Sequence, residues 1–190
     1  MNFKTIGFAV TGSFCTFKKV LPQMRALVSG GYNVIPIMSN VAYSTDTRFG
    51  RAADFVAAVE EICGRSVIKT IEGAEPIGPK KLLDALIIAP ATGNSIAKIA
   101  CGITDTPVTM AAKAHLRNAR PLLIAISTND GLGTNAANIA SLLVARNVYF
   151  VPYRQDDPTG KPNSLVADMD SLMPALIAAL EGHQLQPILA

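Results

Sequence analysis

The chain has 190 residues, of which 49% are hydrophobic and 16% charged, and its formal net charge is +3. A chain of this length buries one core, so we expect a single domain over residues 1–190. Its basic residues form no cluster longer than Lys18-Lys19 or Lys80-Lys81, which argues against a nucleic-acid partner. The mean hydropathy of +0.32 predicts extensive burial, either in a sheet covered on both faces or between subunits.

The first residues, MNFKTIGFAVTGS, lead directly into a strand pattern, with no secretory signal pattern and no apolar stretch of membrane-spanning length. We therefore expect a cytoplasmic protein without a membrane segment. The cysteines Cys15, Cys63 and Cys101 share no C-x-x-C spacing, so neither a disulfide framework nor a metal site is predicted. They are expected to be small buried residues of helices.

Short apolar runs alternate with segments of helical period along the chain. The helical segments Phe17 to Val28 and Phe55 to Ile62 are followed by glycines that end helices, Gly30-Gly31 and Gly64. The runs predicted as strands are Thr5 to Val10, Asn33 to Met38, Ala85 to Ala89, Leu122 to Ile126 and Val148 to Val151, with a weaker one at Val67 to Ile71. This alternation predicts an α/β fold with a doubly wound parallel sheet, a Rossmann-like or flavodoxin-like three-layer sandwich.

The end of the chain is predicted to be a surface loop over residues 152–165, followed by a C-terminal helix and tail over 166–190. The segment YRQDDPTGKP is rich in charge, proline and glycine, and the helix is expected from Val166 to Leu180. The apolar tail, Gln184 to Ala190, is expected to dock onto the domain or a neighbouring subunit.

Small polar residues follow four of the predicted strands, where ligands bind in such sheets. After the first strand, Thr11-Gly12-Ser13 combines a glycine, hydroxyl donors and a helix N-terminus, which favours a phosphate. Each corner alone is equally well explained as a turn and helix cap, with Asn94 or Ser95 capping the helix that follows the third. The corners, which are Thr11 to Ser13, Ser39-Asn40, Thr92 to Ser95 and Ser127 to Asp130, together predict a cleft for a phosphorylated, flat cofactor.

Acid and base candidates are few. His115 is expected to be a packed or surface helix residue, and His183 lies near the chain end, so neither is predicted to act as a base. Asp105 is expected either to bond a ligand hydroxyl or to cap the next helix.

The segment Pro90 to Thr109, PATGNSIAKIACGITDTPVT, resembles the signature of the flavin-dependent cysteine decarboxylases, which include phosphopantothenoylcysteine decarboxylase and the lantibiotic decarboxylases. More distantly, it resembles the flavin prenyltransferases. The resemblance implies that the cofactor is FMN and that the chain forms a homo-oligomer, a trimer or a dodecamer, with sites at subunit contacts. It implies that Thr11, Gly12, Ser13 and Ser39 take the FMN phosphate, while Thr92, Gly93, Asn94 and Ser95 line its ribityl chain and ring.

Further blocks resemble one branch of that family; they are STDTRFG (44–50), AEPIGPK (74–80), MAAKA (110–114), ISTND (126–130) and QDDP (155–158). The resemblance implies a chain that works with a separate A subunit, similar to NAD(P)-dependent dehydrogenases, to oxidise dihydrodipicolinate to dipicolinate during spore formation. NAD(P) would enter only through that partner. Arg48, Thr128 and Asn129 would bind the pyridine dicarboxylate, and Asn129 is the best candidate for a catalytic group.

The chain departs from the decarboxylase pattern in two ways. No histidine precedes His115, so the family's active-site histidine is absent, and the P-x-M-N-x-x-M clamp, at Ile126 to Leu132, keeps only Asn129. These departures disfavour a stand-alone FMN-dependent decarboxylase. A non-catalytic partner that binds substrate and scaffolds the dehydrogenase-like protein is the other alternative.

Overall fold

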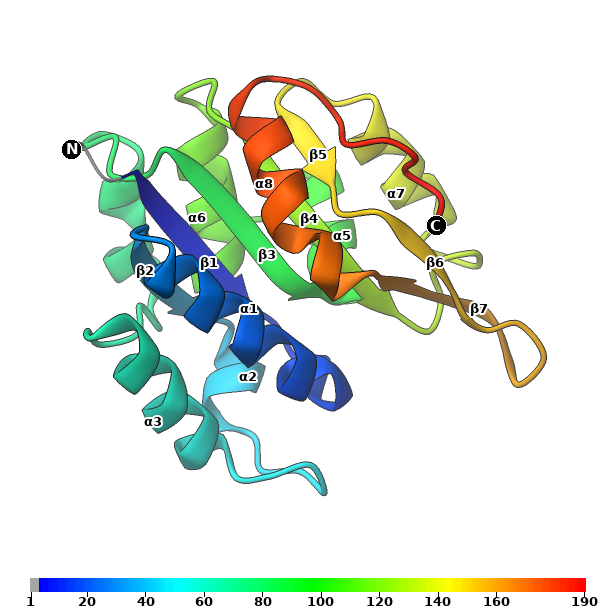
Figure 1. Cartoon of the computed structure of the whole chain (residues 1–190), viewed down its shortest axis with the longest axis horizontal. Coiled ribbons are helices and arrows are strands. Elements are labelled where there is room, and N and C mark those ends of the chain that lie inside the picture. Colours follow the sequence, from blue (N-terminus) through cyan, green and yellow to red (C-terminus); the bar gives the residue numbers. More distant parts are fainter. Residues whose placement is uncertain (1–3) are drawn as a thin grey trace.

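The computed structural model describes residues 4–190, which form a twisted, mostly parallel sheet between two layers of helices (Figure 1). Five strands pair in parallel in the order β2-β1-β3-β4-β5. Their bounds are β1 Thr5–Val10, β2 Asn33–Met38, β3 Ala85–Ala91, β4 Leu122–Thr128 and β5 Val148–Phe150. The predicted doubly wound α/β fold is confirmed.

The central strands are apolar throughout because both of their faces are covered. Every residue of β3 is buried, and so are the first six residues of β4. The pairs Ile6↔Ala85 and Leu86↔Leu122 set the register of the neighbouring strands. Each buried leucine or isoleucine stabilises the fold by about 2 kcal/mol relative to exposure.

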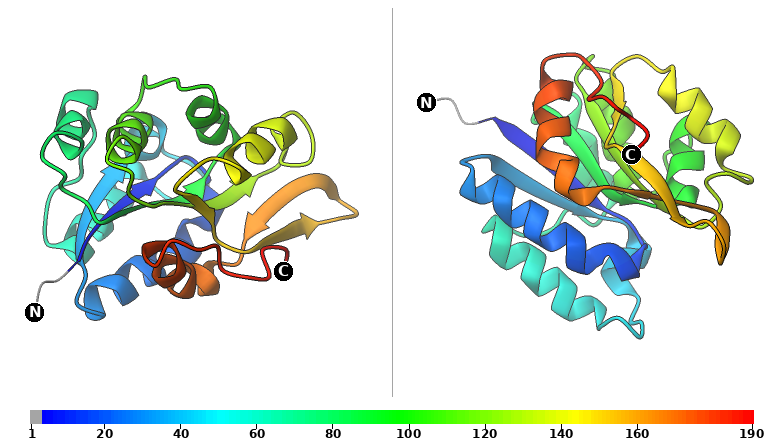
Figure 2. Two further views of the ribbon diagram at one scale, coloured as in Figure 1. Left: turned by 90° about the horizontal axis from the view of Figure 1, so that it is seen from above. Right: turned by 45° about the vertical axis from the view of Figure 1, so that its right-hand side comes forward.

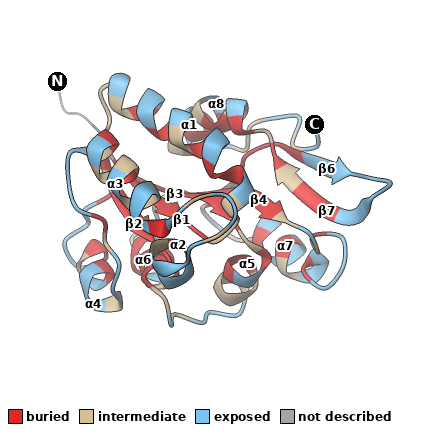
Figure 3. Ribbon diagram, turned by 90° about the horizontal axis from the view of Figure 1, so that it is seen from below, coloured by how far each residue is buried: buried red, intermediate tan, exposed pale blue. Residues whose placement is uncertain are grey.

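Helices α1 (Phe17–Ser29) and α8 (Leu172–Leu180) cover one face of the sheet (Figures 2 and 3). Helices α5 (Gly93–Ala100), α6 (Pro107–Leu116) and α7 (Ala136–Leu143) cover the other, and α3 (Ala52–Cys63) packs beside α1 at the β2 edge. The shorter elements are η1 (Phe14–Thr16), α2 (Asn40–Ser44), α4 (Ile71–Ala74), η2 (Glu75–Ile77) and η3 (Met169–Ser171). The predicted ends of α1 and α3 are confirmed, because Gly31 (φ +87°) and Gly64 (φ +63°) take the left-handed conformation.

The prediction of a surface loop over residues 152–165 is wrong. Strands β6 (Tyr153–Asp157) and β7 (Lys161–Ala167) form an antiparallel hairpin, and β7 pairs with the end of β4 through Ser127↔Val166 and Thr128↔Leu165. Much of the hairpin is exposed, so its strands lack the apolar pattern of the core. The last helix accordingly begins at Leu172 rather than Val166.

Three smaller expectations are also decided. The run Val67 to Ile71 is not a strand, since Ile68 makes only an isolated bridge to Ile37 before α4 begins. Cys15 and Cys101 are exposed, contrary to expectation, while burial raises the pKa of Cys63 to about 11. The tail does dock onto the domain, since Ala190 N donates to Tyr153 O at 3.1 Å.

No helix within residues 4–190 is long and apolar enough to cross a membrane.

His115 is a packed residue of α6 with no exposed surface. Its Nε2 lies 2.9 Å from the carbonyl oxygen of Pro121, and its Nδ1 has no hydrogen-bond partner. Burial lowers the pKa of this imidazole to about 4, so it is neutral in the folded protein near neutral pH.

This burial predicts a loss of stability in acid that begins near pH 6.5, above the range in which carboxylates titrate. Below pH 6.5, the ordinary pKa of histidine, the unfolded chain binds a proton at His115 but the folded chain does not. The free energy of unfolding therefore decreases as the pH is lowered from 6.5, until folded His115 is itself protonated near pH 4. We expect the free energy of unfolding to decrease by up to about 3 kcal/mol across this window, measured by urea denaturation. The exposed His183 provides the control: H183Q should keep the pH dependence, whereas H115Q should lose most of it. A pH-independent wild-type stability between 4 and 6.5 would contradict this account.

Candidate functional site

The corners that follow β1, β3 and β4 open into one cleft of about 1020 Å³ at the carboxyl edge of the sheet. Its walls also include η1, the start of α1 and the β6–β7 hairpin. The predicted residues that line it are Gly12, Ser13, Thr92, Gly93, Asn94, Thr128 and Asn129. The structure thus brings together three of the four predicted corners.

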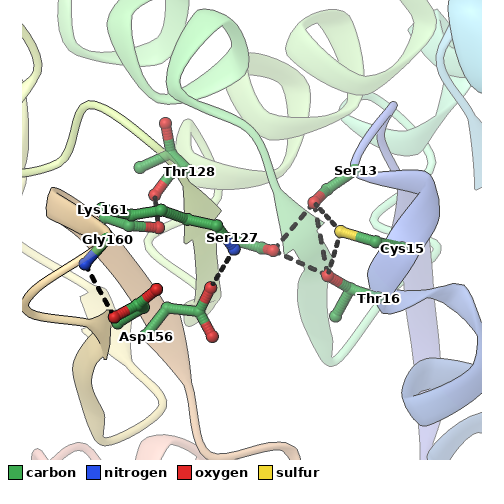
Figure 4. Close-up of polar contacts among 10 residues, drawn as sticks. Ser13, Cys15, Thr16, Ser127, Thr128, Asp156, Gly160 and Lys161 are labelled. Atoms are coloured by element: carbon green, nitrogen blue, oxygen red, sulfur yellow. Dashed lines mark hydrogen bonds and ion pairs between the residues drawn. The ribbon is translucent and has the colours of Figure 1, made fainter.

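A cluster of hydroxyl groups joins the β1 corner to the end of β4 (Figure 4). Ser127 Oγ lies 2.8 Å from both Ser13 Oγ and Thr16 Oγ1, and Cys15 Sγ lies 3.7 Å from Thr16 Oγ1. All four side chains line the cleft. Because hydroxyls both donate and accept, this cluster can bond an anionic or a neutral polar ligand.

Thr11 lies beneath the cleft rather than in its lining. Its side chain is 1% exposed, Oγ1 donates to Pro90 O at 2.6 Å, and the same atom accepts from Thr92 N at 3.0 Å. These bonds tie the β1 corner to the β3 corner.

The β3 corner has the form of a capped helix start. Thr92 is the N-cap of α5 and its side chain accepts from Ser95 N, so neither Asn94 nor Ser95 caps this helix. Ser95 is buried, with its hydroxyl 3.1 Å from that of Thr92, whereas Asn94 is exposed in the cleft. The helix N-terminus therefore presents Gly93 and Asn94 to a ligand.

Gly93 is required by close packing against the β4 corner. A Cβ on Gly93 would lie 2.6 Å from Asn135 Nδ2, 2.6 Å from Asp130 Oδ1 and 2.7 Å from Thr128 Oγ1. These atoms form one network, in which the Thr128 hydroxyl donates to Asp130 and Asn135 Nδ2 donates to Asp130 Oδ2 at 2.6 Å. The network fixes Thr128 and engages both carboxylate oxygens of Asp130.

The β6–β7 hairpin forms the outer wall of the cleft. It is anchored by Ser164 Oγ, which donates to Thr128 O at 3.2 Å. Lys161 Nζ lies 2.9 Å from Asp156 Oδ2, and both residues line the cleft (Figure 4). The hydrogen bond to Asp156 raises the pKa of Lys161, so this lysine stays charged.

Ser39, Arg48 and Asp105, like Thr11 and Ser95, do not reach the cleft lining. Ser39 caps α2 and its hydroxyl accepts from Ala42 N at 3.2 Å. The Arg48 guanidinium lies 4.9 Å from the ring centre of Phe49, and only Phe49 lines the cleft. Asp105 does not cap α6, because Thr106 does so in a capping box, and Asp105 is instead 2.8 Å from Lys98 Nζ.

Several lining residues were missed from the sequence. Thr16 offered a signal, a second hydroxyl one helical turn after Ser13. Lys19, Asp156 and Lys161 also line the cleft, yet the last two reach it only through the unpredicted hairpin.

Comparison with known proteins places the chain among flavoproteins. The family model described as Flavoprotein matches residues 1–170. The B subunit of dipicolinate synthase from Bacillus subtilis (strain 168) is 50% identical over 186 residues, which cover 98% of this chain and 93% of that protein. The crystal structure of the corresponding B subunit of dipicolinate synthase from Bacillus halodurans C has a TM-score of 0.91 and 47% identity, covering 100% of this chain and 98% of that one.

A more distant solved structure shares the fold. The structure of the FMN-dependent cysteine decarboxylase SpaF has a TM-score of 0.65 at 23% identity, covering 94% of this chain and 97% of that one. This chain and SpaF therefore share the fold.

The packing at Gly93 predicts a specific loss of stability. G93A inserts a Cβ into the Asp130 network, and we expect it to destabilise the fold by about 2 kcal/mol in urea denaturation, as overpacking does. G133A is the matched control, because its Cβ would be 3.5 Å from the nearest atoms, and its effect should stay within about 0.5 kcal/mol. Equal effects of the two substitutions would show that the contact is not tight.

Proposed function

The chain belongs to the Flavoprotein family, and we propose that it is the flavin-binding B subunit of a dipicolinate synthase. In this proposal it works with a separate A subunit, similar to NAD(P)-dependent dehydrogenases, and the two oxidise dihydrodipicolinate to dipicolinate during spore formation. One observation carries the proposal: the small polar corners after β1, β3 and β4 line a single cleft. The end-to-end similarity to the Bacillus subtilis protein supports the choice of reaction.

The residues of the cleft fit FMN. Gly12 and Ser13 precede η1 and α1, and Thr92 to Asn94 begin α5, so two helix starts with small side chains lie at one cleft. Backbone N–H groups at such positions favour an anion. A Cβ at position 12 would lie 3.1 Å from Val41 Cγ1, so the glycine lets this corner pack closely against α2. Thr11, Ser39 and Ser95 act in this proposal by shaping the corners, because each is buried and hydrogen-bonded.

When bound, FMN would supply a hydride acceptor for a dihydropyridine. The chain's own residues would orient the substrate and exclude water. Thr128 and Asn129 lie at the end of β4 and just beyond it, and both line the cleft. We assign substrate contacts to these two residues and not to Arg48, whose guanidinium lies over the Phe49 ring and which does not line the cleft.

A scaffold role is the competing proposal. In the described part of the cleft no histidine lines the walls, and Asp130 and Asp156 are already bonded to neighbouring side chains. A chain that only binds substrate and holds its dehydrogenase-like partner would need no further acid or base. Activity measurements on an assembled complex separate the two proposals.

We also propose self-association. Leu132, Leu143 and Leu189 are partly exposed around an apolar groove between α7, β6 and the tail, and Val144 beside it is 87% exposed. Covering these side chains in a homo-oligomer such as a trimer or dodecamer would remove apolar surface from water.

Flavin binding is tested first by titrating the protein with FMN and following flavin fluorescence. S13E sets a carboxylate against the phosphate, and we expect it to weaken binding at least about tenfold. S141E is the control, because Ser141 is an exposed residue of α7 outside the cleft lining. Unaltered binding by S13E, or no saturable binding by the wild-type protein, would refute the assignment of this cleft to FMN.

The second test measures synthase activity of the complex with the dehydrogenase-like partner. We expect N129A to lower kcat/KM at least about tenfold while the complex still forms, because the amide contacts substrate. N40A, at an exposed position of α2, should leave activity unchanged. Full activity of N129A in an intact complex would favour the scaffold proposal.

A further inference from the structure

We propose that Lys19 and Lys161 form a cationic pair that holds the two carboxylates of a pyridine dicarboxylate across the cleft. This inference rests on the proposed function for the identity of the substrate. It replaces Arg48, the positively charged group expected from the sequence, with two lysines whose positions in the cleft lining are part of the structure.

The charges in the cleft point to these two residues. In the lining formed by described residues, the cationic side chains are Lys19 and Lys161 and no arginine is present. The carboxylates there are Asp130 and Asp156, and Asp130 accepts hydrogen bonds from Thr128 and Asn135 on its two oxygens. A dianionic ligand in this cleft would therefore find its charged partners only at the lysines.

Lys161 is held in place by the hairpin. It is the first residue of β7, which pairs with the end of β4, and Asp156 on the adjoining strand contacts its Nζ at 2.9 Å. Figure 4 shows its side chain directed toward the wall that carries Ser127. The Asp156 contact orients the ammonium group and leaves it two further protons to donate.

Lys19 comes from a different wall. It lies in the first turn of α1, and it has no ion pair among the described residues. A lysine of this kind is a flexible point charge, able to meet a carboxylate at several positions.

The arrangement predicts selection by the number of carboxylates. A pyridine dicarboxylate carries one group on each side of its ring nitrogen, so lysines from two walls can each bond one of them. A monocarboxylate can use only one lysine. The pair thus gives the cleft a preference for dicarboxylates that the hydroxyl cluster, being neutral, cannot supply.

The experiment uses the full chain with FMN added and titrates it by calorimetry with pyridine-2,6-dicarboxylate and with pyridine-2-carboxylate. We expect K19M and K161M each to weaken dicarboxylate binding about tenfold or more, with a smaller effect on the monocarboxylate. The wild-type preference should also shrink as salt is raised. K18M is the control, since it removes the same charge from the neighbouring exposed position of α1 outside the lining, and it should bind both ligands like the wild type.

Two further measurements show whether the lysines bind the substrate or the phosphate of FMN. In the complex with the dehydrogenase-like partner, the lysine variants should raise KM for dihydrodipicolinate while kcat changes less than about twofold, and K161R should recover part of the affinity. A fall in FMN affinity with unchanged dicarboxylate binding would place the lysines at the cofactor phosphate and overturn the proposal. Effects equal to those of K18M would overturn it too.

The proposed function fails separately, if the wild-type chain neither binds FMN nor supports synthase activity. Dicarboxylate binding that depends on both lysines would then still support the site itself.

Discussion

The hydrogen bonds of Thr11 hold the cleft together. This side chain is nearly inaccessible to water. Its hydroxyl donates to the carbonyl oxygen of Pro90 in β3 and accepts from the N–H of Thr92, the first residue of the corner that follows β3. Parallel pairing of β1 with β3 brings the two strand ends to one edge, but pairing alone does not fix the loops beyond them. The bonds of Thr11 join those loops, and leaving either backbone group unpaired in the interior would cost about 1–3 kcal/mol.

The same kinds of residue therefore divide into two roles in this cleft. Thr11, Ser39 and Ser95 face inward and satisfy backbone or side-chain groups, whereas Ser13, Asn94 and Thr128 line the cleft. Small hydroxyl residues suit both roles, because they cap helix starts and also bond ligands. Which role a given residue takes depends on its direction from the strand end, and that direction is set by packing between corners.

This division explains what the sequence could and could not predict. The apolar runs of β1, β2, β3 and β4 predicted their strands because each is buried, and they placed Gly12, Gly93 and Asn129 at the correct edge. The hairpin escaped prediction because much of it is exposed and highly charged, so pairing with β4 rather than burial makes it a strand. Lys161 could not be assigned to the cleft without that pairing. Arg48 lies near the predicted corner in sequence, yet its loop directs Phe49 rather than the guanidinium to the lining.

The charged residues of the cleft wall suit a different chemistry from cysteine decarboxylation. A decarboxylase of the pattern that Pro90 to Thr109 resembles requires a histidine, and none lines the described cleft walls here. Oxidation of a dihydropyridine makes a different demand, because aromatisation of the ring itself favours loss of the hydride and the protein must mainly hold a dianion in one orientation. In our proposal the charges of Lys161 on the anchored hairpin and of Lys19 on the first turn of α1 meet that demand, while the neutral hydroxyl cluster can hold polar atoms without adding charge. In this proposal the sheet and its corners provide a flavin cleft, and the lysines of two different walls, Lys19 and Lys161, select the substrate that enters it.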